Sequence, residues 1–201
     1  MEGNRVTSSL YSKLRKYTES WIASLIGFLW GLAEATLFFI VPDVYLGFVA
    51  LLNWRKGLLA VLWTVVGALF GGAIMYFFAA ENSQAATQIV LQVPLINPEM
   101  VQRVRDQMDS LGLISLVSGL FQGIPYKIYA VQAGGQNQPI LDFLLMSIPA
   151  RLARILPATG AAGIAGVALQ KIVKRQTIGT LSFYILFWIG LYLIYFFLIT
   201  R

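Results

Sequence analysis

The chain has 201 residues, of which 58% are hydrophobic and 12% are charged, and its formal net charge is +6. Its mean hydropathy is +0.71, and a soluble domain would carry about twice as much charge. This composition excludes an ordinary soluble protein and indicates an all-α polytopic membrane protein. The chain has no His and no Cys, and no Ser stands beside an evident base, so it lacks the usual general base and nucleophile. We therefore expect no enzyme activity, no catalytic residue, no metal site and no cofactor.

Residues 1–20 are polar and contain four basic side chains: Arg5, Lys13, Arg15 and Lys16. Lys and Arg favour the cytoplasmic side of a membrane, so this segment is predicted to be a cytoplasmic N-terminal tail or surface helix. The basic residues of the chain stand next to apolar segments and do not form one patch, which argues against a nucleic-acid partner.

Residues 21–53 are largely apolar, and as one helix they would measure about 50 Å. That length is too long for one crossing and too short for two. Pro42 interrupts the segment and predicts a break in the helix. We expect a re-entrant hairpin, because it returns Arg55 and Lys56 to the side of the basic N-terminus. A single crossing is the alternative, and it would place both residues on the outer side.

Residues 57–80 carry no charge and predict a transmembrane helix. Gly67, Gly71 and Gly72 put small residues four apart, which allows another helix to approach closely. We interpret these glycines as packing residues.

Residues 97–110 predict a helix outside the membrane. Asn97, Pro98 and Glu99 are typical of a helix start, with a capping side chain, a proline at the first position and an acid in the first turn. The apolar residues then recur on one helical face: Met100, Val101, Val104, Met108 and Leu111. This helix is expected to lie on the membrane or to cap the bundle.

Residues 111–135 form a second apolar segment with a proline break, and we predict a second hairpin there. Gly123, Pro125 and Gly134 are its expected breaks, as Pro42 is in the first hairpin. Lys127 lies beside the break, whereas the first hairpin carries Glu34 and Asp43. The two segments thus resemble each other with the sign of the charge reversed.

Residues 139–173 predict a kinked helix that contains Pro149 and Pro157. Arg151 and Arg154 are three apart, so they share a face of this helix, and Asp142 precedes them. Residues 180–200 predict a terminal uncharged helix rich in aromatic residues.

Together these segments predict an inverted repeat of two re-entrant helical hairpins plus about three to four full transmembrane helices. The charge rule then puts nine of the 15 Lys and Arg on the inner side: Arg5, Lys13, Arg15, Lys16, Arg55, Lys56, Lys171, Lys174 and Arg175. Arg103, Arg105 and Arg201 fall outside. Broken helices that meet near the midplane are the usual indication of a transport site.

Four stretches resemble one family: GLAEATLFFIVPDVYL, GALFGGAIMYFFA, GIPYKIYAVQAGG and FLLMSIPARLARILPA. They are similar to the DedA/VTT (SNARE-associated Golgi protein) superfamily, and the second half is most similar to its YqaA-like branch. The resemblance covers residues 20 to 175. It implies a single VTT-like transmembrane domain over residues 21–201, integral to a bacterial inner (cytoplasmic) membrane, which moves or scrambles lipids.

The resemblance also implies roles for individual residues. The acid of the first hairpin falls on Glu34, and the proline and acid that follow fall on Pro42 and Asp43. The basic residue of the second hairpin falls on Lys127, where many members have arginine, and Gln122 occupies a place that is often arginine. Arg151 and Arg154 match the arginines that follow the second hairpin. Phospholipids and polyprenyl-phosphate carriers, often with proton coupling, are the implied substrates.

The residues themselves leave two interpretations of these charges open. Glu34 and Asp43 are candidates for proton coupling. Burial raises the pKa of a carboxyl group and a nearby cation lowers it, so the two effects together can leave the group between its protonated and ionised states. Lys127, Arg151 and Arg154 are candidates for binding a lipid phosphate. Alternatively, these cations neutralise Glu34, Asp43 and Asp142 in static ion pairs, and Asp43 caps the returning helix.

Three functions follow from these interpretations. The first is a lipid transporter or scramblase with membrane lipids as partners. The second is a secondary transporter or channel for a small ion or solute. The third is a non-transporting membrane-assembly protein whose charges hold the hairpins together. The sequence leaves the oligomeric state open.

Overall fold

The computed structural model describes residues 12–172 and 178–199, and the elements in those ranges are all helical, which confirms the all-α prediction. Three stretches are long and apolar enough to cross a membrane, as expected: Trp54–Glu81, Ile140–Leu169 and Gly179–Phe197. Some of the predicted residues lie outside what is described. They are the first 11 residues of the tail, Lys174, Arg175, Arg201 and the side chain of Lys171. Residues 12–19 are helical.

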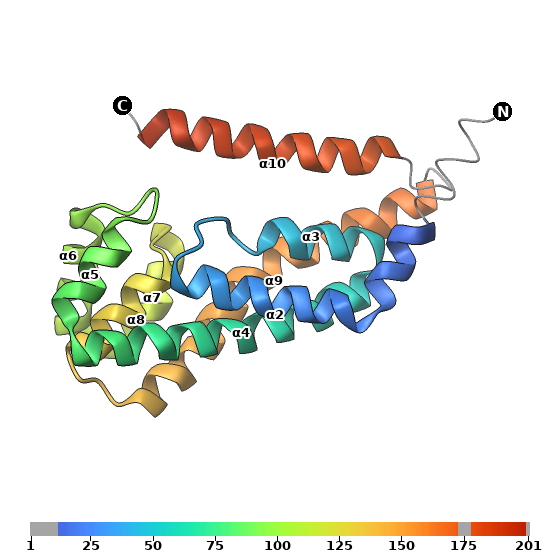
Figure 1. Ribbon diagram of the computed structural model, residues 1–201. Helices are drawn as coiled ribbons and strands as arrows, with labels where there is room; N and C mark the ends of the chain where they lie inside the picture. The colour runs from blue at the N-terminus through green and yellow to red at the C-terminus, as the bar shows by residue number, and fades with distance from the viewer. Residues whose placement is uncertain (1–11, 173–177, 200–201) are drawn as a thin grey trace.

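Helices α2 (Trp21–Thr36) and α3 (Asp43–Leu52) occupy the first predicted hairpin, and the chain reverses direction between them (Figure 1). The break spans residues 37–42, so it begins well before Pro42, which occupies the N-cap of α3. The Trp30 indole holds this connection by donating a hydrogen bond to the carbonyl of Ile40 at 3.0 Å. At about 1.5 Å per residue, α3 is about 15 Å long, half the thickness of a bilayer core.

Helix α4 (Trp54–Glu81) is the central helix, and it packs against α2, α3, α8 and α9. Its closest approach is to α2, where a Cβ added to Gly67 would lie 1.9 Å from the carbonyl oxygen of Phe28. No other residue fits at this position, because the two backbones are in contact. The predicted packing role of Gly67 is therefore confirmed.

Helices α5 (Ser83–Leu91) and α6 (Pro98–Leu111) connect α4 to the second half of the chain. The start of α6 is as predicted, since the Asn97 side chain accepts a hydrogen bond from the Met100 amide at 2.8 Å. Val101, Val104 and Met108 of its apolar face are buried in the hydrophobic core, whereas Leu111 at its end is exposed, so α6 caps the helical bundle with the first part of this face. Helix α5 was not predicted, although Asn82, which caps it, and the buried pair Ala86 and Val90 were available signals.

Three short helical turns precede α8 (Tyr126–Gly135): η1 (Gly112–Ile114), α7 (Ser115–Ser118) and η2 (Gly119–Gln122). Gly123 has φ +67°, which a residue with a side chain rarely adopts, so its predicted role as a break is confirmed. The predicted break at Gly134 is observed one residue later, since α8 ends at Gly135. Gly134 lies inside α8, where a Cβ would meet the Tyr76 carbonyl oxygen at 2.1 Å.

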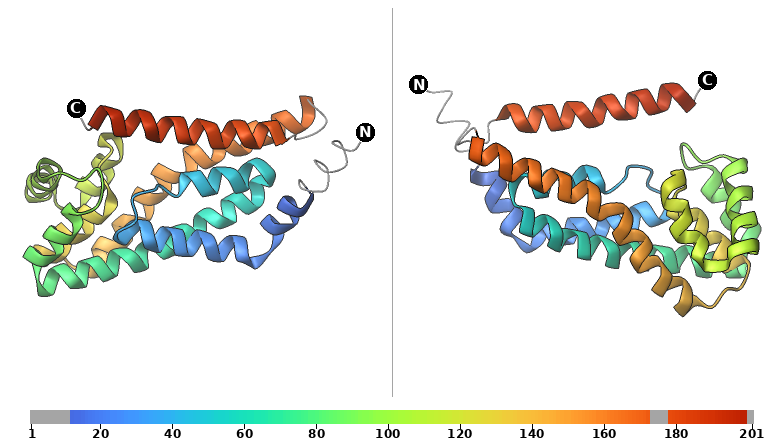
Figure 2. Two further views of the ribbon diagram at one scale, coloured as in Figure 1. Left: turned by 45° about the horizontal axis from the view of Figure 1, so that its top comes forward. Right: turned by 180° about the vertical axis from the view of Figure 1, so that it is seen from behind.

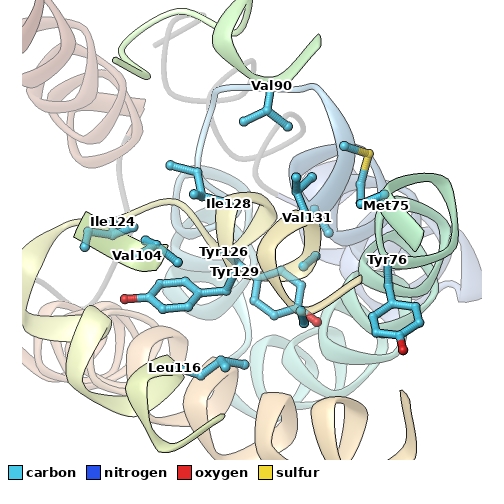
Figure 3. Packing of buried hydrophobic residues seen from close by; sticks show 14 of the residues in the cluster. Met75, Tyr76, Val90, Val104, Leu116, Ile124, Tyr126, Ile128, Tyr129 and Val131 are labelled. Carbon is cyan, nitrogen blue, oxygen red and sulfur yellow. The ribbon is translucent and has the colours of Figure 1, made fainter. Parts of the chain in front are cut away.

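Helix α8 is the centre of the larger hydrophobic core, and nine of its ten residues are buried. Figure 3 shows Ile128 and Val131 of α8 among Met75 and Tyr76 of α4, with Val90 of α5 nearby. A short helix with so little lipid contact is held by protein on all sides. Its first turn is therefore fixed in position.

The last two helices are α9 (Ile140–Ile172) and α10 (Ile178–Ile199). Helix α9 continues through both Pro149 and Pro157. Helix α10 lies along one side of the molecule beside α3, with most of its surface exposed (Figure 2). Asp142, in the first turn of α9, is exposed, and it therefore does not join the buried charges.

Candidate functional site

The five predicted charged residues come together in one place, which we call the charge cluster: Glu34, Asp43, Lys127, Arg151 and Arg154. At its centre the Arg151 guanidinium donates directly to the Glu34 carboxylate and forms an ion pair. Both side chains are buried, with exposed fractions of 2% and 5%. This pair joins α2 to α9.

Arg151 is further fixed by an aromatic ring. Its guanidinium carbon lies 5.0 Å from the centroid of the Tyr126 ring, a distance at which a cation is attracted to the ring face. The Tyr126 hydroxyl in turn donates to Ser147 Oγ at 2.9 Å. The predictions did not include Tyr126, whose only sequence signal was its position between Pro125 and Lys127.

Arg154 lies one helical turn further along α9, and it is less tightly held. Its guanidinium nitrogens are 4.0 Å from Glu34 Oε1 and 3.9 Å from Asp43 Oδ2, at the limit of an ion pair. Its side chain is 32% exposed, compared with 2% for Arg151. Of the two arginines, Arg154 is therefore the one available to another anion.

Lys127 approaches the cluster from α8 and forms no ion pair with any described residue. Its ammonium group donates a hydrogen bond to the Phe38 carbonyl oxygen, at 2.8 Å, in the α2–α3 connection. The predicted pairing of Glu34 with a cation thus involves Arg151 and not Lys127. The lysine links the two proline-interrupted segments to each other.

The cluster lies at the wall of a cavity of about 420 Å³, the charge cavity, lined by Glu34, Asp43, Lys127 and Arg154. Apolar and aromatic side chains form the remaining wall, Trp188 and Tyr192 of α10 among them. Arg154 and Trp188 stand near the middle of α9 and α10, respectively. The cavity is therefore at mid-length of two helices that can each cross a membrane.

Two helix starts line this cavity. Asp43 opens α3 and Lys127 lies in the first turn of α8, and each helix has a proline at its N-cap and no side-chain cap. Figure 1 shows the two helices running away from the α2–α3 connection in different directions. The Asp43 carboxylate was predicted as a cap, and that is wrong, because Pro42 holds the N-cap and Asp43 the first helical position.

The charges of the cluster do not balance. Three cations face two carboxylates, so with all five groups ionised the sum is +1. The predicted third acid, Asp142, is elsewhere. Among the described residues, Asp43 Oδ1 and the Nε and Nη1 atoms of Arg151 are buried without a hydrogen-bond partner. Native proteins usually satisfy such buried groups. The unpartnered Asp43 oxygen is an acceptor and Arg151 does not line the cavity, so it is the net positive charge, with Lys127 and Arg154 at the cavity wall, that favours an anionic ligand.

Three of the four predicted breaks lie at the charge cavity, and the fourth lies away from it. Gly123 and Pro125 line the charge cavity, and Pro42 precedes Asp43 at its edge, whereas Gly134 lies against α4 away from it. No group of His, Cys, Asp or Glu able to hold a metal occurs in the described part of the chain.

Comparisons with protein-family models, with curated proteins and with solved structures find no match to this chain. The resemblance to the DedA/VTT superfamily therefore stays a prediction. What can be said of function rests on the charge cavity and on the helices around it.

Proposed function

We propose that this protein moves anionic lipids across a membrane, as a transporter or scramblase, and that the charge cavity takes the phosphate head group. One observation carries the proposal: a net-positive cluster lines a cavity at mid-length of helices able to span a bilayer. Charged side chains at such depth are costly and generally serve a substrate or ion pathway. Apolar walls beside the charges suit a ligand that has both a charged and an apolar part.

Within this proposal the three cations have different tasks. Arg154 and Lys127 bind the head group, because Arg154 is partly exposed and held only at the limit of ion pairing, and both line the cavity. A guanidinium matches phosphate oxygens well. Arg151 holds Glu34 and the Tyr126 ring, so it positions the site.

The two acids offer the means of proton coupling. Asp43 Oδ1 has no hydrogen-bond partner among the described residues, and its other oxygen is 3.9 Å from Arg154. A phosphate that attracts Arg154 would weaken this contact. Asp43 would then take up a proton more readily, because a nearby cation favours the ionised carboxylate.

The proposal includes the membrane placement predicted from the sequence. The α2–α3 pair and the segment from η1 to α8 act as two re-entrant hairpins that enter from opposite sides. The half-membrane length of α3 and α8, about 15 Å each, supports this placement. Their uncapped N-terminal ends carry partial positive charge, which attracts an anionic group to the point where they meet.

Transport can be measured with purified protein in liposomes. The liposomes contain phosphatidylglycerol with a fluorescent label on its head group, and a reductant is added outside. The rate at which label from the inner leaflet is quenched gives the rate of flipping. Lys127→Gln, Arg154→Gln and Glu34→Gln are each expected to slow flipping about tenfold or more, since a charge-assisted hydrogen bond contributes about 1.5–3 kcal/mol. The matched control is Arg103→Gln, which removes a cation from the exposed surface of α6. It should leave the rate unchanged.

Two results would contradict the proposal. Unchanged flipping in both Lys127→Gln and Arg154→Gln would show that the charge cavity does not take the head group. A wild-type protein that moves a small anion but never lipid would establish the solute transporter instead. The folding of each variant is checked by its elution as a single species in detergent, so that loss of structure is not mistaken for loss of transport.

The hairpin placement has its own experiment. Because the native chain has no Cys, single cysteines can be introduced at Lys13 and at Arg55 and labelled from one side of intact vesicles. Both are expected to react from the same side. Reaction from opposite sides would mean that residues 21–53 cross the membrane once.

A further inference from the structure

A second space adjoins the charge cavity. It is a groove of about 560 Å³ between α10 and the α2–α3 pair, which we call the α10 groove, and its volume is within the range of about 300–1,000 Å³ typical of ligand pockets. Among the described residues, no charged side chain lines it. Aromatic and aliphatic side chains form both walls, among them Trp30 and Phe48 on one side and Ile185 and Ile189 on the other.

The two spaces share part of their walls. Phe39, Trp188 and Tyr192 line both the charge cavity and the α10 groove, so the boundary between them consists of three aromatic side chains. The Phe39 ring meets the Tyr192 ring edge to face, with centroids 6.4 Å apart. A ligand whose charged end lies against Arg154 has its nearest apolar space on the other side of these rings.

Polar contacts tie α10 to the hairpin at this same boundary. The Tyr184 hydroxyl donates to the carbonyl oxygens of Asp43 and Val44, at 3.1 and 3.0 Å, and the Tyr192 hydroxyl accepts from the Val41 amide at 2.9 Å. Beyond these ties, the groove side of α10 stays open. Ile185, Ile189 and Leu193, spaced four apart on one helical stripe, are each more than half exposed.

We propose that the α10 groove binds one hydrocarbon chain of the anionic lipid whose head group enters the charge cavity. This proposal rests on the proposed function, since it takes the cavity to be the head-group site. The occupant follows from the order of the two spaces. A net-positive cavity with apolar walls adjoins an uncharged aromatic groove, and this order matches a phosphate joined to a hydrocarbon chain.

Trp30 and Trp188 both line the groove, so their fluorescence can report a lipid chain there. The other three tryptophans, Trp21, Trp54 and Trp63, are exposed at 72%, 47% and 46%. A groove reporter therefore carries Trp21→Phe, Trp54→Phe and Trp63→Phe. The matched control carries Trp30→Phe and Trp188→Phe and keeps the three exposed tryptophans, which report general contact with the bilayer.

Each reporter is placed in phosphatidylcholine bilayers that contain a small fraction of phosphatidylglycerol, with bromine atoms on the acyl chains of one lipid or the other. At equal mole fraction, brominated phosphatidylglycerol should quench the groove reporter about threefold more than brominated phosphatidylcholine, a modest difference in affinity. The control reporter should show no preference. Adding Lys127→Gln and Arg154→Gln to the groove reporter should remove the preference, because the head group then loses its cations.

Equal quenching of the groove reporter by both lipids would overturn the proposal, since ordinary bilayer chains would then fill the groove. A preference that survives Lys127→Gln and Arg154→Gln would also overturn it, because the chain would not belong to a lipid held in the charge cavity. The experiment measures binding, so it fails separately from the proposed function. Flipping without selective quenching would contradict only the proposal for the α10 groove. Selective quenching without flipping would contradict only the proposed transport function.

Discussion

Five helices of this protein show two kinds of start. Helices α4, α5 and α6 begin at Asn53, Asn82 and Asn97, and each asparagine side chain accepts a hydrogen bond from the first turn. Helices α3 and α8 begin at a proline, without such a cap. None of the three asparagines lines the charge cavity, although Ile96, directly before the α6 cap, does. At the proline starts, Asp43 of α3 and Pro125 of α8 line it.

This difference has an electrostatic consequence. The first amide groups of a helix have no partner within the helix, and together they carry a partial positive charge. An asparagine cap satisfies one of them, and a proline at the same place offers no side-chain acceptor. In α3 the amide groups of Val44 and Tyr45 donate to the carbonyl oxygens of Val41 and Pro42. The start of α8 lines the cavity with Pro125 and Lys127, and its first amide groups add positive potential beside the cluster's net charge of +1.

The largest expected effect concerns the ion pair at the centre of the cluster. Arg151→Met should destabilise the protein by about 3–5 kcal/mol, because it leaves the buried Glu34 carboxylate without its direct partner. Thermal unfolding in detergent measures the loss. If Arg151 instead acts mainly as a head-group ligand, stability will be nearly unchanged and only flipping will fall.

A paired variant separates the two roles of this ion pair. Combining Arg151→Met with Glu34→Gln removes both charges, so no uncompensated charge stays buried. We expect the double variant to recover a large part of the stability that Arg151→Met loses. If the double variant instead loses as much stability as the two single variants together, the residues are not coupled.

The next effect concerns the packing that fixes α8. Gly134→Val should destabilise the protein by about 1–3 kcal/mol, because the new side chain would press on the Tyr76 backbone of α4. Gly160→Val is the matched control, since a Cβ at Gly160 meets nothing within 4 Å. Equal thermal unfolding of the two variants would mean that α8 does not need this close contact.

A smaller effect is expected at a capped helix. Asn97→Ala removes the acceptor of the Met100 amide and should lower stability by about 1 kcal/mol. Lipid flipping should stay at the wild-type rate, because Asn97 itself is not among the residues that line the charge cavity, although its neighbour Ile96 is. A slower rate at unchanged stability would tie α6 to the transport path and weaken the contrast between the two kinds of helix start.

Much of this arrangement could be predicted from the sequence, because its strongest signals are local. Prolines and charges within apolar segments predicted the breaks before α3 and α8, and Asn97 predicted the start of α6. The five charged residues were named as one site because buried charges must find partners. The structure does bring them together.

The errors arise where a residue's role depends on a distant neighbour. Gly134 was predicted only as a break near the end of its helix, and its close contact with Tyr76 on α4, 58 positions earlier in the sequence, was missed. Asp142 was counted among the buried acids, although the start of α9 leaves it exposed. The α10 groove was not predicted at all, since its walls come from opposite ends of the chain.

The smallest expected change tests the proline starts directly. Pro125 has φ −62° and ψ 134°, the extended conformation of an N-cap, so a serine there can cap α8 without moving the backbone. Pro125→Ser should change stability by less than about 1 kcal/mol, since the new cap offsets the lost rigidity of proline. Its hydroxyl would accept a hydrogen bond from an amide group in the first turn of α8, beside the proposed head-group site. Flipping of labelled phosphatidylglycerol should then fall by a few fold, while Pro125→Ala, which adds no acceptor, should stay closer to wild type. If the two variants flip lipid equally fast, the uncapped start of α8 does not help to bind the phosphate, and the cations alone account for the site.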